Sequence, residues 1–465
     1  MSDFPALADL QAAFGPETLR LAADIPERNW VDCSLEPPCR PRALLLPRST
    51  EEVSRALAIC HAHGQTVVIQ GGLTGLAGGA VPGPDEVALS LEKMRGVEEV
   101  DLKARSLTAL AGTPLEEVQQ AAEAAGLHCG IDLGARGSCS IGGNIATNAG
   151  GNRVIRYGMA RANLLGLEAV MADGTVLRHL NKMQKNNTGY DWPQLVAGSE
   201  GTLAVITRVT LSLHAPVQQI GTVALSLPDF DAALATLGRL QTHFPGQIQC
   251  FEVMWKPFMT AARDIVGLTL PFDPVPEVMA LVELDLPQDA DAGDGIMTAL
   301  EDLFAEEVIT DAVLATSQAQ ADKLWQLRES AVEYRAHGYR MLGLDISLPL
   351  DRMREAVETL HADMDAALPD VPVIVFGHAA DSNIHVCALL TGPEDPRGAE
   401  VSRVTYDIVA RYAGSVSAEH GIGRHKRPYL HLSRSAEQIS AMSLLRRAWD
   451  PAGILNPGRV LPDAV

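Results

Sequence analysis

Apolar and polar residues in the opening part of the chain predict a strand, a helix and a second strand. The apolar run 43–46 fits a buried strand, and apolar residues then recur at helical spacing from a capping box at 49–52 to Gly64. A second apolar run, at 66–70, leads into the glycine-rich segment 71–79. A strand that ends in clustered glycines is typical of a loop whose backbone approaches a ligand closely.

The same style of pattern continues through the first half of the chain. A second capping box, at 113–116, opens a predicted helix that stops at Gly126, and a second glycine cluster covers 130–158. Short apolar strands are expected at 164–171 and 202–209.

Beyond the first half, long strands alternate with long helices and glycines become sparse. We expect strands at 221–227, 247–253, 278–286, 341–348 and 371–376, and helices near 229–242, 318–335 and 351–366. A domain boundary therefore falls near 215–220. Mixed helices and strands of this kind predict an α+β fold.

Composition excludes several classes of protein. The chain has 465 residues, 47% hydrophobic and 20% charged, which is too apolar for a disordered chain. Its 37 Lys and Arg against 58 Asp and Glu give a formal net charge of -21, which argues against binding to nucleic acid. No apolar run reaches the roughly 20 residues of a membrane span, and residues 1–5 show no secretory signal, so we expect a cytoplasmic protein.

The cysteines support a reducing compartment. They are odd in number, scattered and never arranged as C-x-x-C, so they predict neither a disulfide framework nor a thiolate zinc site. We expect most of them to be small buried residues: Cys33, Cys39, Cys60, Cys129, Cys139, Cys250 and Cys387.

The two glycine clusters together predict a cradle for a diphosphate, because glycine lets successive backbone N–H groups converge on an anion. Neither G-x-G-x-x-G nor G-x-x-x-x-G-K-[ST] occurs, so an ordinary Rossmann domain and a P-loop are not supported. One cluster alone would fit a glycine-rich hairpin. The second cluster, with its pairs at 142–143 and 150–151, favours a cofactor site.

Four segments resemble the PCMH-type FAD domain of the vanillyl-alcohol-oxidase superfamily: 70–75, 132–151, 187–191 and 198–203. Within it the chain is most similar, over nearly its whole length, to FAD-linked dehydrogenases of D-2-hydroxy acids, especially the hydroxyglutarate branch. The resemblance implies an FAD domain at 1–218, an α+β substrate (cap) domain at 219–415 and a C-terminal segment, 416–465, that returns to complete the flavin site.

The resemblance also implies which residues hold FAD. No histidine lies in 70–76, where several relatives attach the flavin covalently, so we expect non-covalent FAD. The implied cofactor residues are Gln70, Gly71, Gly72, Leu73, Thr74, Gly75, Gly134, Ala135, Ser138, Gly142, Gly143, Asn144, Thr147, Asn148, Gly150, Glu200, Gly201, Ile206 and Asn456.

A second constellation follows the apolar run 371–376. His378 and His385 are seven residues apart and would face opposite sides of one straight strand, so they converge only if 380–382 turns between them. Two imidazoles with a carboxylate such as Glu419 form a common ligand set for a catalytic zinc. A single histidine is more often a hydrogen-bonded or surface residue than a ligand, so the spacing alone is a weak indication of a metal site.

The family resemblance assigns roles to this constellation. It implies that His378, His385 and Glu419 hold a divalent metal, with zinc as the first choice. His420 would be the catalytic base, Asn383 would support the substrate or the site, and Arg328 would bind the substrate carboxylate. An ordinary helix-surface arginine paired with an acid is the alternative for Arg328.

The chain departs from the hydroxyglutarate pattern at three polar positions. Val332, Gly343 and Cys387 stand where that branch has threonine, lysine and asparagine, and Ala379 and Ala380 replace a glycine pair. A second substrate carboxylate would lack partners at these positions unless Arg335, Arg340 or another group has taken over.

We therefore expect FAD- and metal-dependent oxidation of a D-2-hydroxy acid to its 2-oxo acid. D-2-hydroxyglutarate is the nearest substrate, and D-lactate or a more apolar acid is the alternative. The rival classes are a non-redox metal hydrolase or isomerase, a flavin subunit that only passes electrons, and an oxidase that uses oxygen. The electron acceptor, a quinone, an electron-transfer flavoprotein or a cytochrome, and the oligomeric state, with a homodimer as one option, stay open.

Overall fold

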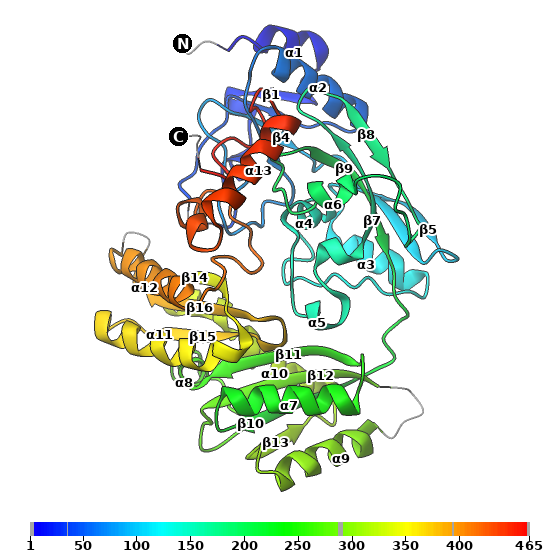
Figure 1. The fold of residues 1–465 in the computed structure, drawn as a ribbon. Helices are drawn as coiled ribbons and strands as arrows, with labels where there is room; N and C mark the ends of the chain where they lie inside the picture. The colour runs from blue at the N-terminus through cyan, green and yellow to red at the C-terminus, as the bar shows by residue number, and fades with distance from the viewer. Residues whose placement is uncertain (1–3, 35, 287–291, 393–394, 463–465) are drawn as a thin grey trace. The chain divides into compact units, whose positions relative to one another are not determined.

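The chain folds into two compact units, seen here in a computed structural model that describes residues 4–34, 36–286, 292–392 and 395–462. Unit 1 comprises residues 1–151, 157–216 and 419–465, and unit 2 comprises residues 152–156 and 217–418. In Figure 1 unit 1 takes the colours from blue through blue-green to the first green, and the red end of the scale, whereas residues 217–418, from green to orange, form most of unit 2.

Unit 1 contains two sheets. The first has the order β1 (Leu19–Leu21), β2 (Ala43–Leu45), β4 (Val87–Ser90) and β3 (Val67–Gln70), and is parallel except for β1. The second is antiparallel, with the order β5 (Val97–Asp101), β6 (Ser106–Leu110), β9 (Val205–Ser212), β7 (Leu164–Val170) and β8 (Val176–His179). The helices are α1 (Leu7–Ala13), α2 (Thr50–Ala62), α3 (Leu115–Ala124), α4 (Ile141–Thr147), α6 (Trp192–Val196) and α13 (Ala436–Trp449), while α5 (Val154–Tyr157) spans the return from unit 2.

Local signals position α2 but not α3. Ser49 caps α2 by accepting a hydrogen bond from the Glu52 N–H at 3.3 Å, but the predicted capping box is only half formed, because the Glu52 carboxylate accepts from the Arg48 N–H at 2.7 Å. The capping box predicted at 113–116 is wrong, because the Thr113 hydroxyl donates instead to the Leu110 carbonyl at 2.7 Å and Pro114 stands at the N-cap of α3. The strand predicted at 202–209 forms as β9, three residues later in the chain.

The C-terminal part of unit 1 lies against β3, which is an edge strand of the first sheet. The N–H of Val67 donates to Ile454 at 2.8 Å, and the N–H of Asn456 donates to the Val67 carbonyl at 2.9 Å. Fully buried Arg459 donates to the Glu86 carboxylate and to the Val81 carbonyl. Backbone groups that an edge strand would leave unpaired are thereby satisfied by a segment almost 400 residues away in sequence.

Unit 2 is built on a seven-stranded antiparallel sheet. Its order is β13 (Asp311–Leu314), β10 (Gln219–Leu227), β12 (Val278–Leu286), β11 (Ile248–Trp255), β15 (Val373–His378), β16 (Asn383–Leu390) and β14 (Arg340–Ser347). All the strands predicted from the second half of the sequence form, and β13 and β16 are added to them.

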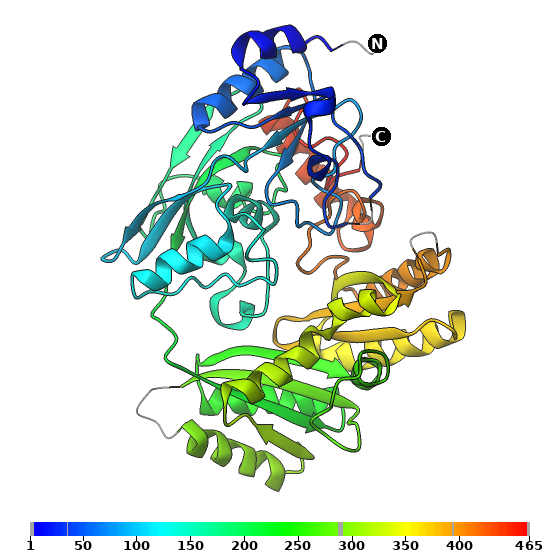
Figure 2. The same ribbon diagram turned by 180° about the vertical axis from the view of Figure 1, so that it is seen from behind.

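Two helical layers cover the sheet of unit 2. The helices α7 (Phe230–His243), α9 (Ala292–Ala305), α11 (Met353–Ala367) and α12 (Arg397–Arg411) lie toward the viewer in Figure 1. Figure 2 shows α10 (Gln318–Glu329) on the opposite face, where α8 (Lys256–Ala261) and the 3-10 helix η5 (Ser330–His337) also pack. The predicted helix 318–335 thus divides into α10 and η5.

The face under α8, α10 and η5 carries an apolar cluster that includes Met254, Phe258, Tyr334, Phe376 and Cys387. Side chains alternate along each strand, so His378 and His385 project from the same face as Phe376 and Cys387. The polar residues considered below therefore lie at one end of a continuous apolar layer.

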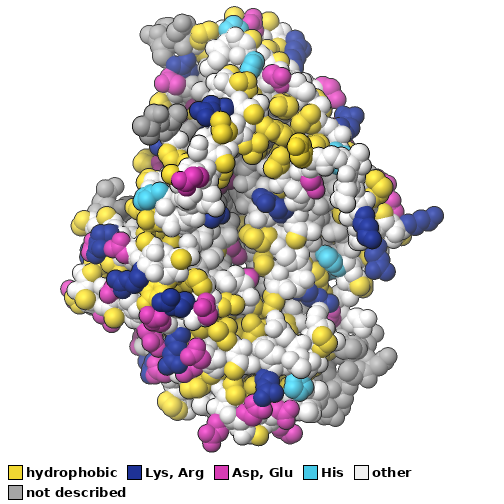
Figure 3. Space-filling view, viewed as in Figure 1, with side chains coloured by type: hydrophobic (Ala, Val, Ile, Leu, Met, Phe, Trp, Pro, Cys, Tyr) yellow, Lys and Arg dark blue, Asp and Glu magenta, His cyan; other side chains and the backbone are white. Residues whose placement is uncertain are grey.

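The surface of unit 2 carries intermixed charges. Figure 3 shows acidic and basic side chains side by side over α11 and over α7 with α9. They include the ion pairs Arg354–Asp231 at 2.7 Å, Arg354–Glu358 at 3.0 Å and Arg239–Glu306 at 2.5 Å. Among the described helices, none combines the length and apolar character needed to cross a membrane.

Candidate functional site

The turn between β15 and β16 brings two histidine rings together in unit 2. The 3-10 helix η7 (Ala379–Asp381) and Ser382, which has a left-handed φ of 71°, reverse the chain, as the sequence predicts. Phe376 pairs with His385 in the ladder, and the ring centroids of His378 and His385 lie 5.4 Å apart at 82°. A ring nitrogen of one histidine lies within 4.8 Å of a ring nitrogen of the other, so one ion could contact both.

A buried carboxylate on β11 links one of these histidines to the predicted substrate arginine. Glu252 Oε1 lies 2.5 Å from His378 Nδ1, and Glu252 Oε2 accepts a hydrogen bond from Arg328 Nε at 2.6 Å. Burial raises the pKa of Glu252, but Arg328 and His378 outweigh that effect and lower the pKa to about 2. Glu252 was not among the predicted site residues, since no motif surrounds it.

Arg328 lies in the interior of unit 2. It retains only 8% exposure, and its guanidinium carbon lies 4.6 Å from the centroid of the Phe376 ring. Its position is that of a cation held between an aromatic face and a carboxylate. The alternative of an ordinary surface arginine is therefore wrong, although the expected pairing with an acid is present.

Asn383 opens β16 with a buried amide. It retains 3% exposure, and neither its Nδ2 nor its Oδ1 has a hydrogen-bond partner among the described residues. Alternation along β16 places it on the same face as His385. Buried amides are almost always hydrogen-bonded, so this side chain is suited to a ligand that the unit receives.

Asp345 on β14 is a further carboxylate beside the histidine pair. It is opposite His385 in the β14–β16 ladder, with 4.0 Å between its Oδ1 and His385 Nδ1. Its Oδ2 accepts from the backbone N–H of Ala418 at 3.1 Å and from the Ser417 hydroxyl at 3.3 Å. These two bonds hold the last residues of unit 2 against β14, and Glu419 is the next residue in the chain.

Two of the departures from the hydroxyglutarate pattern lie opposite one another. Gly343 pairs with Cys387 in the β14–β16 ladder. This pair is two residues along each strand from the Asp345–His385 pair, so both pairs lie on the same face. A Cβ at Gly343 would lie 3.6 Å from Cys387 Sγ, an ordinary contact. Burial raises the pKa of the Cys387 thiol to about 12, so it carries no charge near neutral pH. Val332 is 76% exposed.

In unit 1 the two glycine clusters pack against each other. A Cβ at Gly71 would lie 2.5 Å from Ser140 Oγ, and a Cβ at Gly72 would lie 2.7 Å from the Cys139 Cα. Only glycine permits this approach of the loop after β3 to the segment before α4. A Cβ at Gly75, in contrast, would find only Asp32 Oδ2, at 3.8 Å, so this part of the loop is open.

The side chain of Gln70, a predicted cofactor residue, makes its hydrogen bonds to other residues of the protein. Its Nε2 donates to the carbonyls of Asn29 at 2.9 Å and Ala80 at 3.0 Å, and its Oε1 accepts from Asn29 Nδ2 at 2.9 Å. The fully buried side chain therefore holds the two ends of the glycine loop in place.

Asn456 and Glu200 join the C-terminal segment to the same region. Asn456 Oδ1 accepts from the Ile69 N–H at 2.8 Å, and its Nδ2 donates to the Glu200 carbonyl at 2.6 Å. The Glu200 carboxylate accepts from the N–H groups of Ile422 at 2.7 Å and Gly423 at 2.8 Å. Burial raises the pKa of this carboxyl, although these two bonds act to lower it.

Glu419 and His420 belong to unit 1. Glu419 Oε1 accepts from the Gly151 N–H at 2.8 Å, and a Cβ at Gly150 would lie 2.6 Å from the same oxygen. The glycine pair 150–151 thus makes room for a carboxylate that was predicted as a metal ligand.

The remaining predicted cofactor residues all lie in unit 1, in the loop after β3, in the segment leading into and through α4, and near β9. They are Leu73, Thr74, Gly134, Ala135, Ser138, Gly142, Gly143, Asn144, Thr147, Asn148, Gly201 and Ile206. Each unit therefore assembles its own share of the predicted residues: His378, His385, Asn383 and Arg328 in unit 2, and the others in unit 1.

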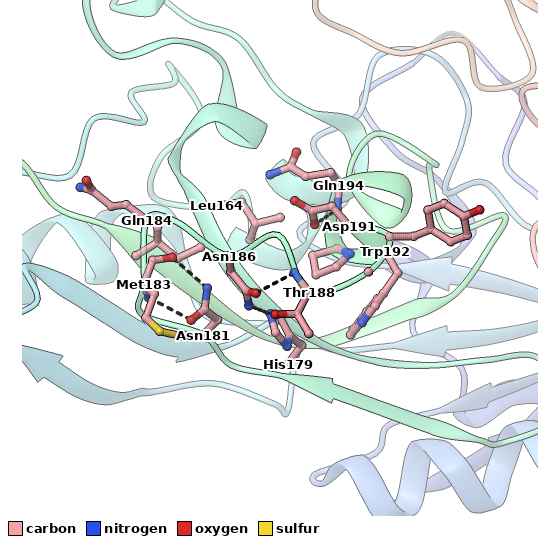
Figure 4. A pocket seen from close by; sticks show the side chains of 14 residues that line it. Leu164, His179, Asn181, Met183, Gln184, Asn186, Thr188, Asp191, Trp192 and Gln194 are labelled. Atoms are coloured by element: carbon pink, nitrogen blue, oxygen red, sulfur yellow. Dashed lines mark hydrogen bonds between the residues drawn. The ribbon is translucent and has the colours of Figure 1, made fainter.

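Unit 1 also contains a hollow that the predictions did not include. It measures about 210 Å³ and is lined mainly by the segment 181–194 with Leu164 and His179. Figure 4 shows its amide side chains, and the dashed lines include those from Asn186 to His179 at 3.3 Å and from Asn186 to the Thr188 N–H at 3.1 Å. None of the predicted cofactor residues lines it.

Comparison with protein families matches both halves of the chain. Residues 41–179 match the model described as "FAD binding domain", and residues 217–460 match "FAD linked oxidases, C-terminal domain". These matches confirm the prediction of an FAD-binding domain followed by the family's second domain.

Curated relatives extend along most of the chain. D-2-hydroxyglutarate dehydrogenase of Xanthomonas citri pv. viticola is 38% identical over 428 residues, covering 90% of this chain and 89% of that protein. The mitochondrial enzyme of the same name from Bos taurus is 37% identical and covers 90% and 77%. A putative mitochondrial D-lactate dehydrogenase of Schizosaccharomyces pombe is 34% identical and covers 89% and 80%.

Solved structures agree on the fold. An alkyldihydroxyacetonephosphate synthase has a TM-score of 0.76 at 18% identity, covering 99% of this chain and 86% of its own. A p-cresol methylhydroxylase with substrate bound also has a TM-score of 0.76, at 16% identity, covering 98% and 96%. The predicted α+β fold with a PCMH-type FAD domain is confirmed. The chain therefore belongs to the family of FAD-linked oxidases and dehydrogenases that includes the D-2-hydroxyglutarate dehydrogenases.

Proposed function

We propose that the protein oxidises a D-2-hydroxy acid to the 2-oxo acid with FAD and a divalent metal. The observation that carries this proposal is the set of groups on one face of the unit 2 sheet. Two histidines lie ring to ring, a buried arginine lies on the far side of a shared carboxylate, and the amide of Asn383 is buried with no partner among the described residues.

The donor set of unit 2 fits a metal. Because His378 Nδ1 faces the Glu252 carboxylate, its Nε2 is the nitrogen suited to an ion, and His385 presents a second ring within 4.8 Å. A bound zinc would supply Lewis-acid polarisation of the substrate hydroxyl. We propose Glu419 as the third ligand, because it directly follows Ala418, whose N–H is bonded to Asp345 opposite His385.

The protein's own groups would then share the remaining work. Arg328 keeps both terminal nitrogens of its guanidinium outside the bond to Glu252, and a substrate carboxylate can accept from them. We propose that His420 takes the hydroxyl proton, since an imidazole accepts protons near neutral pH. FAD, when bound, would supply the acceptor for the hydride that leaves the carbon carrying this hydroxyl group.

The glycine loops of unit 1 are the proposed cradle for non-covalent FAD. Protein atoms fill the space beside Gly71 and Gly72, whereas the space beside Gly75 and Gly134 is open. The C-terminal segment, bonded through Asn456 and Glu200, would fix the loop against the cofactor.

One experiment tests the reaction directly. A panel of D- and L-2-hydroxy acids is offered to the purified protein with an artificial dye as electron acceptor. We expect a yellow protein that reduces the dye with D-acids only and loses activity with EDTA until zinc or manganese is added. Absence of flavin absorption would refute the FAD assignment, and full activity of both the EDTA-treated protein and the His385→Ala variant would refute the metal.

D-2-hydroxyglutarate, the substrate named for the most similar relatives considered above, is the first candidate substrate. A monocarboxylic acid such as D-lactate, or a more apolar acid, is the second. It is supported by Gly343 and the neutral thiol of Cys387, which add no second cation to Arg328 on this face of unit 2. Arg340 alternates to the other face of β14, so it does not replace the missing charge there.

The substitution Gly343→Lys tests the choice between these substrates. The extended backbone and the open space at Gly343 accept a side chain, and a lysine would add a cation beside the site. We expect the ratio of kcat/KM for hydroxyglutarate over lactate to rise at least tenfold, corresponding to about 1.4 kcal/mol. Gly343→Met is the control of similar length without charge, and an equal change in both variants would contradict the interpretation.

We also propose a cytoplasmic location and an acceptor that is a quinone, an electron-transfer flavoprotein or a cytochrome. A homodimer remains the proposed alternative to a monomer. Cell fractionation, acceptor reduction and sedimentation test these three points.

A further inference from the structure

We propose that Glu252 is the positioning residue of the site: one carboxylate that sets the orientation of both His378 and Arg328. The inference rests on the proposed function, since it assumes that these two residues meet metal and substrate. It assigns a role to a residue that carries no sequence motif and that touches neither reacting atom.

The geometry separates the two oxygens of Glu252. Oε1 lies 2.5 Å from His378 Nδ1, and Oε2 lies 2.6 Å from Arg328 Nε. Because the two oxygens belong to one rigid planar group, a rotation of the carboxylate that lengthens one bond also disturbs the other. The imidazole and the guanidinium are therefore fixed relative to each other through a single side chain.

Each bond selects the atoms that remain for chemistry. A carboxylate at Nδ1 holds the proton on that nitrogen, so the ring lone pair that can bind an ion is the one on Nε2. On Arg328 the bond uses Nε and leaves the two terminal nitrogens for a planar anion. The Phe376 ring, 4.6 Å from the guanidinium carbon, supports the orientation of that group.

Burial protects the bonds of Glu252 from competition by water. Glu252 has no exposed surface, and His378 retains 5% and Arg328 8% exposure, so water does not compete for these bonds. A buried carboxylate is costly unless it is fully paired. In the register of the sheet Glu252 is directly opposite His378, so the backbone ladder itself keeps the pair together.

A nearby buried carboxylate gives a matched control. Glu283 on the adjacent strand β12 retains 6% exposure, accepts from Trp325 Nε1 at 2.6 Å and lies 3.4 Å from Arg153. It is also a paired buried acid in the same sheet, and its partners Trp325 and Arg153 are distinct from His378 and Arg328. A loss that follows only from removing a buried charge should therefore appear in both Glu283→Gln and Glu252→Gln.

The test uses the full-length protein loaded with FAD. Zinc affinity is measured by competition with a chromophoric chelator without substrate, and KM and kcat are measured with the best D-2-hydroxy acid of the panel. For Glu252→Gln we expect zinc affinity to fall about 10–100-fold and KM to rise at least tenfold. For Glu283→Gln we expect both values to stay within twofold of the wild type, with a comparable loss of thermal stability.

The outcomes separate this inference from the proposed function. A wild-type protein that binds no zinc and oxidises no 2-hydroxy acid defeats the proposed function itself. A wild type that does both, with Glu252→Gln retaining zinc affinity and KM, overturns the role of Glu252 alone. Equal losses in Glu283→Gln would also overturn it. If Glu252→Gln does not fold, Glu252→Asp is measured, and failure of both to fold assigns Glu252 to stability instead.

Discussion

At the scale of single residues, the amide of Asn383 shows how a site can conflict with stability. Its two polar atoms are buried with no partner among the described residues, and an unsatisfied buried group costs about 1–3 kcal/mol. Asn163 is a useful contrast, because it is equally buried but donates to the carbonyls of Tyr157 at 3.0 Å and Met159 at 3.2 Å.

We predict that Asn383→Leu stabilises the metal-free and substrate-free protein by about 1–3 kcal/mol while lowering kcat/KM at least tenfold. The replacement is similar in size and removes the unpaired amide. Urea unfolding and steady-state kinetics measure the two effects. The control Asn163→Leu should be destabilising, because it removes bonds that exist, and destabilisation of both variants would contradict the prediction.

The histidine pair was predicted from the spacing of its two residues around a turn, and Arg328 from the family resemblance. Glu252 has no such pattern: its partners lie 76 and 126 residues away, and only the strand order of the sheet brings them together. The same holds for Asp345, whose importance comes from its register opposite His385. Contacts of this kind depend on topology, which a single sequence does not specify locally.

At the scale of elements, the loop after β3 contains glycines with two different roles. Gly72 is required by the close approach of Cys139, whereas Gly75 has open space beside it. The sequence predicted the strand and the glycine cluster together but could not distinguish these roles. The distinction depends on the packing of a segment 60 to 70 residues further along the chain.

We predict opposite behaviour for alanine at the two positions. Gly72→Ala should reduce stability or folding of the FAD-free protein, because the Cβ would lie 2.7 Å from a backbone atom. Gly75→Ala should leave the melting temperature of the FAD-free protein within about 2 °C and should weaken FAD retention if this loop faces the cofactor. Differential scanning fluorimetry and flavin release on dilution measure both, and tight FAD binding by Gly75→Ala would exclude a direct contact there.

At the scale of the whole molecule, the chain does not divide into consecutive domains. Sequence patterns predicted a boundary near 215–220. In the structure the chain leaves unit 1 after Pro216 and returns to it at Glu419. The five residues 152–156 also join unit 2, where Arg156 lies 2.7 Å from Asp285 and Arg153 bonds to Gln249 at 3.2 Å. No local pattern indicates this excursion, since its partners lie more than 90 residues away.

The return of the chain to β3 has a consequence for biosynthesis. Val67 and Ile69 must wait for Ile454 and Asn456, so the first sheet cannot complete its hydrogen bonds until residues 419–465 have been translated. At about 5–20 residues per second, this last segment takes some seconds to make after unit 2 has emerged. During that interval the glycine loops would lack the C-terminal segment that bonds to β3. Unit 1 would therefore be the last unit to complete its fold, although its synthesis begins before that of unit 2.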